Sequence, residues 1–326
     1  MIGTTVSHYE ILERLGSGGM GVVYKARDLT LDRLVALKFL SAHRGGESDR
    51  RRFLREARAV SSLEHPNICT VYEVGEAGDG RLFIAMTLCE GEPLKEKLER
   101  GPLPPDEAVR LAAGIAAGLA AAHEKGIVHR DIKPGNVMVA PGSPPGSRVK
   151  LVDFGIAKLA EETRLTRAGT VVGTAAYIAP EQFRGEAFDH RSDVWALGVL
   201  LYEMLTGQLP FDADLQHELV EAILRREPVP PSILASGVPH ELDRVVLRAL
   251  AKRPADRYPD MKALREDLER LLASPEELGK TVVAIPSSRS WPITPSPADP
   301  SGTGSRRGSP SLSSQTGPRY EILEPV

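Results

Sequence analysis

The residues best suited to chemistry lie in one short run and in a tripeptide further along the chain. The run His129–Asn136 (HRDIKPGN) places an acid, a base and an amide together, and Asp153-Phe154-Gly155 adds a second carboxylate. Mg²⁺ prefers a few oxygen ligands from protein, completed by phosphates and water. Two carboxylates and an asparagine in this pattern therefore indicate Mg-nucleotide chemistry.

A glycine-rich turn near the N-terminus is suited to binding phosphates. Gly16–Gly21 (GSGGMG) lies between two strand-type runs, and glycines let backbone amides approach phosphates without obstruction by side chains. A dinucleotide-binding site would require a helix after the glycines, whereas Val22–Ala26 is typical of a strand. We interpret the turn as a hairpin lid over phosphates, with an ordinary glycine-rich turn as the alternative.

Lys38 ends the apolar run Val35–Lys38, where an unpaired ammonium group would be costly. Glu56 borders the apolar stripe formed by Phe53 and Val60 on a predicted helix, so it can point at the sheet. We predict an ion pair between Lys38 and Glu56 that aims the ammonium at nucleotide phosphates. Two solvated surface charges are the alternative.

The elements that must position these residues change type near residue 90. Before it, alternating apolar residues and turn signals predict strands at 9–15, 22–28, 34–40, 69–76 and 82–88, with one helix at 48–63. After it, helical periodicity predicts helices at 94–100, 106–125, 191–206, 216–225, 240–250 and 258–272, and short strands at 137–139 and 149–152. The loop 141–146 between these two strands reads as a hairpin.

The ordered set of motifs resembles the eukaryotic-type Ser/Thr protein kinases that also occur in bacteria. The resemblance covers Tyr9 to Leu272 and rests on the glycine loop, Val-Ala-Leu-Lys, His-Arg-Asp with its Asn, Asp-Phe-Gly and Ala179-Pro180-Glu181. It implies an α+β, bilobal protein kinase fold, with a small β-rich N-lobe containing one helix (about 9–89) and a larger, mainly helical C-lobe (about 90–273). Residues 1–8 then form an N-terminal extension.

The resemblance implies ATP-dependent transfer of the γ-phosphoryl group to Ser/Thr hydroxyls of proteins. Asp131 would orient the substrate hydroxyl and accept its proton, and Lys133 would neutralise the transferring group. Lys38 and Glu56 complete the expected catalytic set. Asn136 and Asp153 would hold Mg²⁺, with Mn²⁺ as a substitute. Lysine at position 133 and the pair Gly173-Thr174 are similar to the Ser/Thr branch of the family rather than the tyrosine branch.

The same resemblance places Met86 at the back of the adenine pocket and makes Thr87 to Cys89 the hinge whose backbone binds adenine. An acidic residue commonly starts this hinge, but because main-chain groups bind adenine, Thr87 should preserve ATP binding. Cys89 is either an unremarkable hinge residue or a reactive group near the nucleotide. The full expected nucleotide-binding set is Leu15, Gly16, Ser17, Gly18, Gly19, Met20, Gly21, Val23, Ala36, Lys38, Met86, Thr87 and Cys89.

Supporting and regulatory residues also follow from the resemblance. Asp193 should hydrogen-bond the catalytic-loop backbone, and Glu181 should pair with Arg257. Thr166 and Thr170 are candidate autophosphorylation sites that would make the kinase self-activating, because a phosphate there could pair with Arg130. The alternative is a polar loop in which these threonines are incidental.

Composition limits the partners and the location. The net charge of −3, with 26% charged residues of both signs, gives no field that would hold a nucleic acid or an acidic membrane. The two cysteines, Cys69 and Cys89, belong to no zinc-type or disulfide cluster, which fits a reducing cytosol. The apolar stretch at 109–122 is too short to span a bilayer, and no secretory signal is visible. We expect a cytoplasmic enzyme with protein substrates, which could dimerise for autophosphorylation.

The last part of the chain differs in composition. Residues 274–326 are rich in Ser, Pro and Gly, which cannot bury enough apolar surface to offset chain entropy, so we expect a disordered tail. Within it, Tyr320–Glu324 repeats Tyr9–Glu13. A truncated second module, a chance match and a pairing strand are the three interpretations.

Two other functional classes share part of this sequence pattern. A pseudokinase scaffold would share the fold without transfer chemistry, but its usual signature is missing because Lys38, Asp131 and Asp153 are all present. A small-molecule phosphotransferase would not need the long segment that ends in Ala179-Pro180-Glu181, which in the resembling family serves peptide binding.

Overall fold

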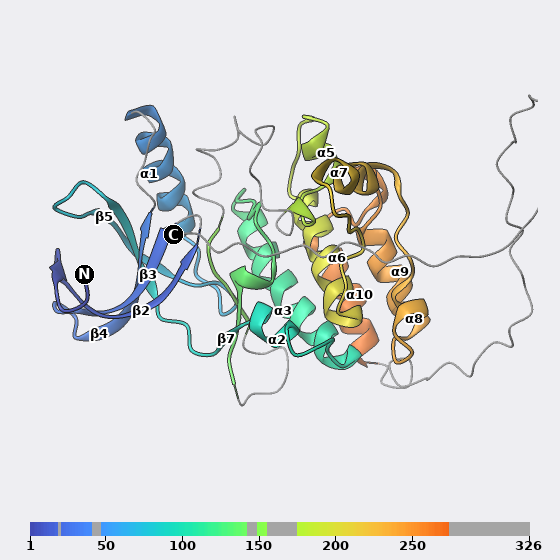
Figure 1. Ribbon diagram of the computed structural model, residues 1–326, viewed down its shortest axis with the longest axis horizontal. Coiled ribbons are helices and arrows are strands. Elements are labelled where there is room, and N and C mark those ends of the chain that lie inside the picture. Colours follow the sequence, from blue (N-terminus) through green and yellow to red (C-terminus); the bar gives the residue numbers. More distant parts are fainter. Residues whose placement is uncertain (19–20, 41–46, 142–148, 155–174, 274–326) are drawn as a thin grey trace, which may run out of the picture. The chain divides into compact units, whose positions relative to one another are not determined.

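The computed structural model describes residues 1–18, 21–40, 47–141, 149–154 and 175–273 (Figure 1). In this part of the chain, a six-stranded antiparallel sheet with one helix is followed by a mainly helical region that contains a three-stranded sheet. This is the small β-rich lobe and larger helical lobe predicted from the sequence.

The N-lobe sheet has the strand order β1-β2-β3-β4-β6-β5. Its strands are β1 (Thr5–Val6), β2 (Tyr9–Gly18), β3 (Gly21–Asp28), β4 (Arg33–Leu40), β5 (Val71–Glu76) and β6 (Leu82–Thr87). Each of the predicted strands is present. The residues assigned to an N-terminal extension also contribute, because β1 pairs with β2 through Thr5 opposite Glu10.

The N-lobe helix α1 (Glu47–Ser61) packs its apolar stripe against the sheet. Phe53, Ala57 and Val60 are buried in one cluster with Ile84 and Met86 of β6, and α1 also contacts β5. The helical spacing of these residues puts them on one face. The stripe read from the sequence is therefore the face that meets the sheet.

The C-lobe contains the predicted helices and strands together with several shorter elements. Its helices are α2 (Leu94–Leu98), α3 (Pro105–Glu124), α5 (Pro180–Phe183), α6 (Arg191–Thr206), α7 (Gln216–Arg225), α8 (Pro231–Leu234), α9 (His240–Ala249) and α10 (Met261–Ala273). Its strands are β7 (Glu92–Pro93), β8 (Val137–Val139) and β9 (Val149–Leu151), paired in the order β7-β8-β9. Short 3₁₀ turns occur at Pro134–Asn136 and Pro254–Asp256.

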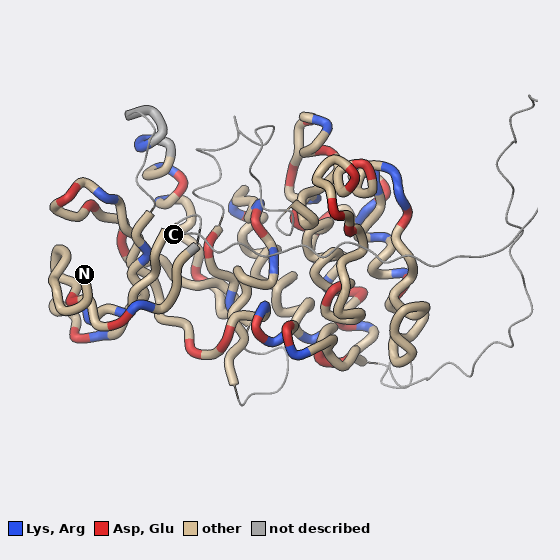
Figure 2. Tube along the Cα trace, viewed as in Figure 1, with Lys and Arg blue, Asp and Glu red and all other residues tan. Residues whose placement is uncertain are grey.

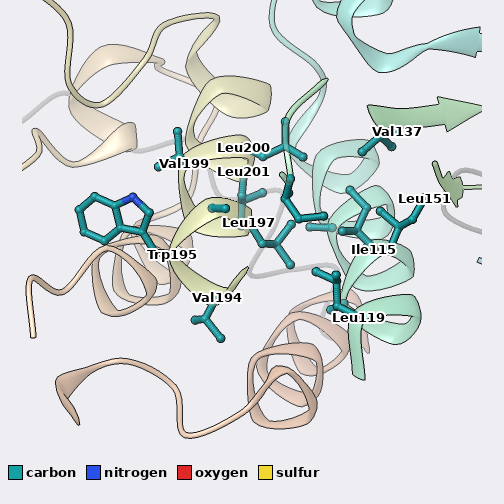
Figure 3. Packing of buried hydrophobic residues seen from close by; sticks show 14 of the residues in the cluster. Ile115, Leu119, Val137, Leu151, Val194, Trp195, Leu197, Val199, Leu200 and Leu201 are labelled. Carbon is teal, nitrogen blue, oxygen red and sulfur yellow. The ribbon is translucent and has the colours of Figure 1, made fainter. Parts of the chain in front are cut away.

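Helix α6 forms the centre of the C-lobe core (Figure 3). Val194, Trp195 and Leu197 are among its many buried residues, and a helix that is apolar on every side belongs in an interior. It packs against α3, whose Ile115 and Leu119 face the same core. Helix α6 is therefore buried at the centre of the C-lobe.

Two surface properties bear on partners. No helix among the described residues is long and apolar enough to cross a membrane. Along the chain trace, acidic and basic residues are interspersed in both lobes rather than gathered on one (Figure 2). The described fold therefore shows the mixed charge pattern that the composition indicates.

Candidate active site

The segment His129–Asn136, called the catalytic loop below, is fixed to α6 by Asp193. This carboxylate is buried, and it accepts the main-chain N–H of His129 at 2.8 Å and that of Arg130 at 2.9 Å. Its Oδ2 also lies 2.7 Å from His123 Nε2. Burial alone would raise the pKa of Asp193, but the hydrogen bonds that its carboxylate accepts from His123 and from the main-chain N–H of His129 outweigh it and hold the pKa below its ordinary value. The predicted bonding of Asp193 to the loop backbone is confirmed.

His129 connects the loop to the segment that carries the second carboxylate. Its ring is fully buried; Nδ1 accepts the N–H of Asp131 at 3.3 Å, which leaves Nε2–H to donate to Val152 O at 3.2 Å. Burial lowers the pKa of His129 despite the neighbouring carboxylates. The imidazole is therefore neutral, and its centroid lies 4.4 Å from that of Phe154.

Asp131 lies at the centre of the loop's polar contacts. Its side chain is almost completely buried, and Oδ2 is 2.8 Å from Lys133 Nζ. Asn136 Nδ2 donates to the same Oδ2 and to the main-chain oxygen of Asp131, both at 2.8 Å. The structure thus brings the predicted Asp131, Lys133 and Asn136 together and holds one carboxylate oxygen between two donors.

The second carboxylate is placed beside this loop. The N–H of Val152 donates to Asn136 O at 3.0 Å, and Asp153 Oδ1 lies 2.7 Å from Lys38 Nζ. Asp153 and Arg130 have φ values of 58° and 65°, a conformation that costs a non-glycine residue roughly 1–2 kcal/mol and is concentrated at functional sites. The surrounding contacts hold both residues in these conformations.

Lys38 has an anionic partner, as its buried position requires, and this partner is Asp153. The side chain of Lys38 is buried on β4, and Glu56 is half-buried on α1. The predicted ion pair between Lys38 and Glu56 stays a prediction.

The glycine-rich turn is described at its two ends, whereas Gly19 and Met20 lie outside the described residues. Leu15, Gly16, Ser17 and Gly18 end β2 and Gly21 begins β3, with Gly18 opposite Gly21 in the hairpin. Gly21 has a φ of 138°, and a Cβ there would lie 1.8 Å from Phe39 O. This position therefore requires glycine for both conformational and steric reasons.

Residues from both lobes line one cavity. Lys38 and Met86 contribute from the N-lobe, and Asp153 and Phe154 contribute from the segment after β9. Val23 lies opposite Lys38, and Ala36 lies opposite Met86, in the β3-β4 and β4-β6 pairings. The cavity lining therefore includes the predicted nucleotide-binding residues Lys38 and Met86 together with the second carboxylate, and Val23 and Ala36 lie opposite these two residues in the sheet.

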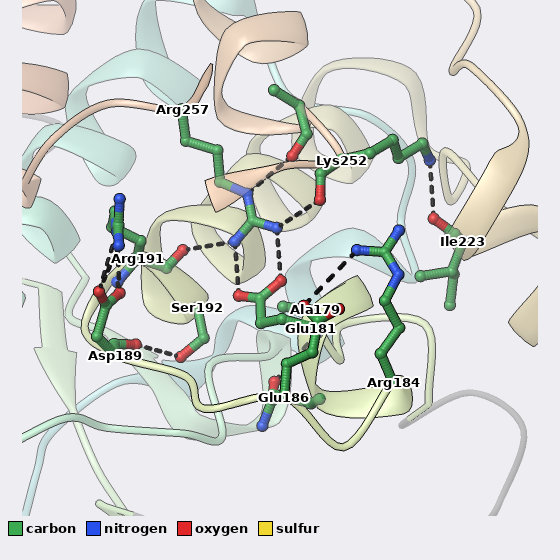
Figure 4. Close-up of polar contacts among 12 residues, drawn as sticks. Ala179, Glu181, Arg184, Glu186, Asp189, Arg191, Ser192, Ile223, Lys252 and Arg257 are labelled. Carbon is green, nitrogen blue, oxygen red and sulfur yellow. Dashed lines mark hydrogen bonds and ion pairs between the residues drawn. The ribbon is translucent and has the colours of Figure 1, made fainter. Parts of the chain in front are cut away.

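The segment after the undescribed residues 155–174 is anchored by a buried ion pair (Figure 4). Arg257 Nη1 and Nη2 lie 2.8 and 2.6 Å from the two carboxylate oxygens of Glu181, and neither side chain is exposed by more than 2%. Arg257 also donates to the carbonyl oxygens of Ala251 and Arg191. The predicted pairing is confirmed.

Tyr177 provides a second anchor for the same segment. Its hydroxyl donates to Glu203 of α6. Burial raises the pKa of both groups, and the carboxylate charge raises that of Tyr177 further. The two candidate phosphorylation sites, Thr166 and Thr170, lie outside the described residues.

His123 is a further residue of the site, which the sequence pattern did not predict. His123, near the end of α3, contacts Asp193 and so supports the catalytic loop indirectly. A histidine in the last turn of a helix that leads directly into the loop was the available signal.

Residues 9–268 match the protein kinase domain. The chain belongs to the protein kinase family. Among curated relatives, it is 42% identical over 277 residues to "Serine/threonine-protein kinase pkn3" of Myxococcus xanthus, covering 82% of this chain and 51% of that protein. It is also 42% identical over 269 residues to "Serine/threonine-protein kinase PknB" of Mycobacterium leprae, covering 81% and 43%. This kinase thus spans about half the length of these two relatives.

Solved structures agree with this assignment. The PknI kinase domain of Mycobacterium tuberculosis superposes with a TM-score of 0.65 at 31% identity, covering 83% of this kinase and 98% of that chain. The bacterial-type Ser/Thr protein kinase family and the bilobal fold predicted from the sequence are therefore confirmed.

Proposed function

We propose that this kinase transfers the γ-phosphoryl group of ATP to Ser/Thr hydroxyls of protein substrates, as a non-specific Ser/Thr protein kinase. The observation that carries the proposal is the position of Asp131, whose Oδ2 is held by Lys133 and Asn136 in a loop fixed to α6. Relatives named as Ser/Thr protein kinases support the substrate class.

The proposed chemistry needs one proton acceptor and fixed positive charge. Asp131 orients the substrate hydroxyl and accepts its proton while the oxygen–phosphorus bond forms and the bond to the β-phosphate oxygen breaks. Lys133, 2.8 Å from Asp131, neutralises charge on the transferring group. Positioning and electrostatic stabilisation supply most of the acceleration in such reactions.

Nucleotide and metal binding are assigned to the neighbouring residues. The carboxylate of Asp153 and the amide oxygen of Asn136 are hard oxygen ligands suited to Mg²⁺, with Mn²⁺ as a substitute. The hydrogen bond from Val152 N–H to Asn136 O keeps the two ligand segments adjacent. Lys38, which pairs with Asp153 here, binds the α- and β-phosphates, and Glu56 orients it. Thr87 to Cys89 bind adenine through their backbone.

Regulation is proposed to use residues outside the described ranges. Autophosphorylation of Thr166 or Thr170, within a dimer, orders the loop through Arg130. In this proposal, the catalytic domain comprises residues 9–273, residues 274–326 form a disordered tail, and the enzyme acts in the cytoplasm.

Transfer of labelled γ-phosphate from Mg-ATP to the kinase itself and to a generic basic acceptor protein tests the function. Label on phosphoserine or phosphothreonine supports the proposal, and repetition with Mn²⁺ tests the substitute metal. Label on phosphotyrosine alone contradicts the assigned hydroxyl class. Bound Mg-ATP without any transfer, to substrates or to itself, favours the pseudokinase alternative.

A further inference from the structure

The chain's two cysteines meet beside the hinge although they lie on different strand ends. Cys69 precedes β5 and Cys89 follows β6. Val71 pairs with Met86, and Thr87 N–H donates to Thr70 O at 2.9 Å, so the antiparallel register continues beyond the strands. Leu88 then lies opposite Cys69, and Cys89 is the next residue along the chain.

Side-chain contacts confirm that the two sulfurs converge. Cys69 Sγ lies 3.4 Å and Cys89 Sγ 3.8 Å from one acceptor, the carbonyl oxygen of Thr87, and the two thiols also hydrogen-bond each other. Because both sulfurs approach the same carbonyl oxygen, the two side chains converge on one point beside the hinge, as a disulfide between them requires.

The surroundings make the two thiols chemically different. The hydrogen bond with Cys89 and burial both raise the pKa of Cys69, whereas the hydrogen bond from Cys69 lowers the pKa of Cys89 despite its partial burial. The charge of Lys150 lowers the pKa of Cys89 further. Because the thiolate is the nucleophile and Cys89 is the more exposed of the two thiols, we assign the first reaction to Cys89 and the second to Cys69.

Small molecules have a route to the pair. Cys69 is only 5% exposed, but its side chain lines the cavity that Val71, Ile84 and Met86 also line. Cys89 is only partly buried. A small oxidant can therefore reach Cys89 from outside, while bulky thiol reagents are excluded from Cys69.

We propose that Cys69 and Cys89 form a site of reversible oxidation by hydroperoxides, which closes a disulfide between the start of β5 and the hinge. The Cys89 thiolate attacks the hydroperoxide, a sulfur–oxygen bond forms, the oxygen–oxygen bond breaks, and the alcohol or water product leaves. Cys69 sulfur then attacks the sulfenic acid of Cys89; the disulfide bond forms and water leaves with the Cys69 proton. Two thiols are oxidised and one hydroperoxide is reduced.

The consequence for nucleotide binding rests on the proposed function. A disulfide replaces the thiol contacts at Thr87 O and ties the hinge backbone to β5. Because adenine binding is assigned to the backbone of Thr87 to Cys89, the oxidised kinase should bind Mg-ATP several-fold more weakly, and reduction by dithiothreitol should restore the affinity.

Intact-mass analysis of the full chain after treatment with hydrogen peroxide tests the site independently of activity. The expected result is loss of two hydrogens per chain, protection of both cysteines from alkylation after denaturation, and recovery on reduction. Two alkylated cysteines, or only sulfinic and sulfonic products, would overturn the proposal. So would a disulfide that links two chains.

Two serine variants test the order of the steps. Cys69→Ser should accumulate sulfenic acid at Cys89, detected by dimedone, because the resolving thiol is missing. Cys89→Ser should leave Cys69 largely unreacted. Equal dimedone labelling of both variants contradicts the assigned roles.

Mg-ATP binding separates the oxidation site from the proposed function. If the disulfide forms but the reduced chain does not bind Mg-ATP, the oxidation site stands and the proposed function fails. If Mg-ATP binds equally well to the reduced and the oxidised chain, the proposed effect on the hinge is wrong.

Discussion

Asp193 stabilises the catalytic loop by accepting hydrogen bonds from main-chain N–H groups. Its amide variant therefore tests whether the position of this loop affects catalysis without affecting nucleotide binding. In Asp193→Asn, an NH₂ group replaces one acceptor beside His129 N–H or Arg130 N–H. A lost hydrogen bond to a charged group costs roughly 1.5–3 kcal/mol. We expect kcat to fall by about tenfold or more with little change in Mg-ATP affinity.

The matched control is Asp189→Asn, which alters a carboxylate just before the same helix. Asp189 bonds Arg191 at a partly exposed position and has no described contact with the catalytic loop. Steady-state kinetics and nucleotide titration of both variants, with thermal denaturation to verify folding, provide the measurement. An unchanged kcat in folded Asp193→Asn would show that this carboxylate is dispensable for loop position.

His129 gives a pH prediction at the same scale. Burial depresses the pKa of His129 in the folded chain, whereas in the unfolded chain the pKa keeps its ordinary value of about 6.5. When the pH falls below about 6.5, the unfolded chain therefore takes up a proton that the folded chain does not. The stability from neutral His129 is therefore complete above that pH and is lost as pH falls from about 6.5 toward the folded pKa.

We expect wild type to lose more thermal stability between about pH 7.5 and 5.5 than His129→Phe, which keeps a ring against Phe154 but cannot titrate. Other titrating groups are common to both chains and cancel in the difference. Parallel loss of melting temperature in the two chains would mean that His129 is not the group responsible.

Lys38 illustrates what the sequence could and could not predict about single residues. Its apolar strand correctly indicated a buried ammonium that needs an anion. The described partner is Asp153, far away in sequence, because partner choice depends on how β4 and the segment after β9 meet in space. The spacing of residues along the chain carries no information on how these two segments pack together.

At the scale of elements, the Glu181–Arg257 pair joins the start of α5 to the segment before α10. Removing one partner of a buried pair leaves an uncompensated charge and costs roughly 3–5 kcal/mol. We expect Arg257→Met to lower the free energy of unfolding by that amount in urea titrations.

The control is Arg265→Met, which breaks an exposed pair with Glu269 on α10 and should cost no more than roughly 0.5 kcal/mol. The double variant Arg257→Met with Glu181→Met should recover part of the loss, because no buried charge is left alone. Equal effects of the two single variants would contradict the importance given to burial.

Element boundaries were predictable where the local pattern is strong. Helices α6 and α7 begin and end at the predicted residues. Helix α10 begins at Met261 rather than Tyr258, because the Asp260 side chain accepts the N–H of Ala263 at 2.8 Å and caps the helix there. The two-residue strands β1 and β7 were missed because two residues are too few to show an alternating pattern, and it is pairing with β2 and β8 that defines them.

At the scale of the molecule, the order of motifs predicted the family and the fold, and matching to known kinases confirmed both. What the order could not predict is the geometry of the site. The contacts among Asp131, Lys133 and Asn136, and the support of the loop by α6, depend on the packing of α3 against α6. That packing arises from apolar residues all around α6, which periodicity marks as buried without naming their partners.

If Asp131 accepts the proton in phosphoryl transfer, its amide variant should lose most of the rate. The measurement is the initial rate of γ-phosphate transfer in wild type, Asp131→Asn and the surface control Asp106→Asn, with Mg-ATP affinity measured for each. General-base catalysis contributes roughly 10²–10⁴-fold. We expect a loss of that size in Asp131→Asn alone, with Mg-ATP binding retained. Transfer by folded Asp131→Asn at close to the wild-type rate would contradict it.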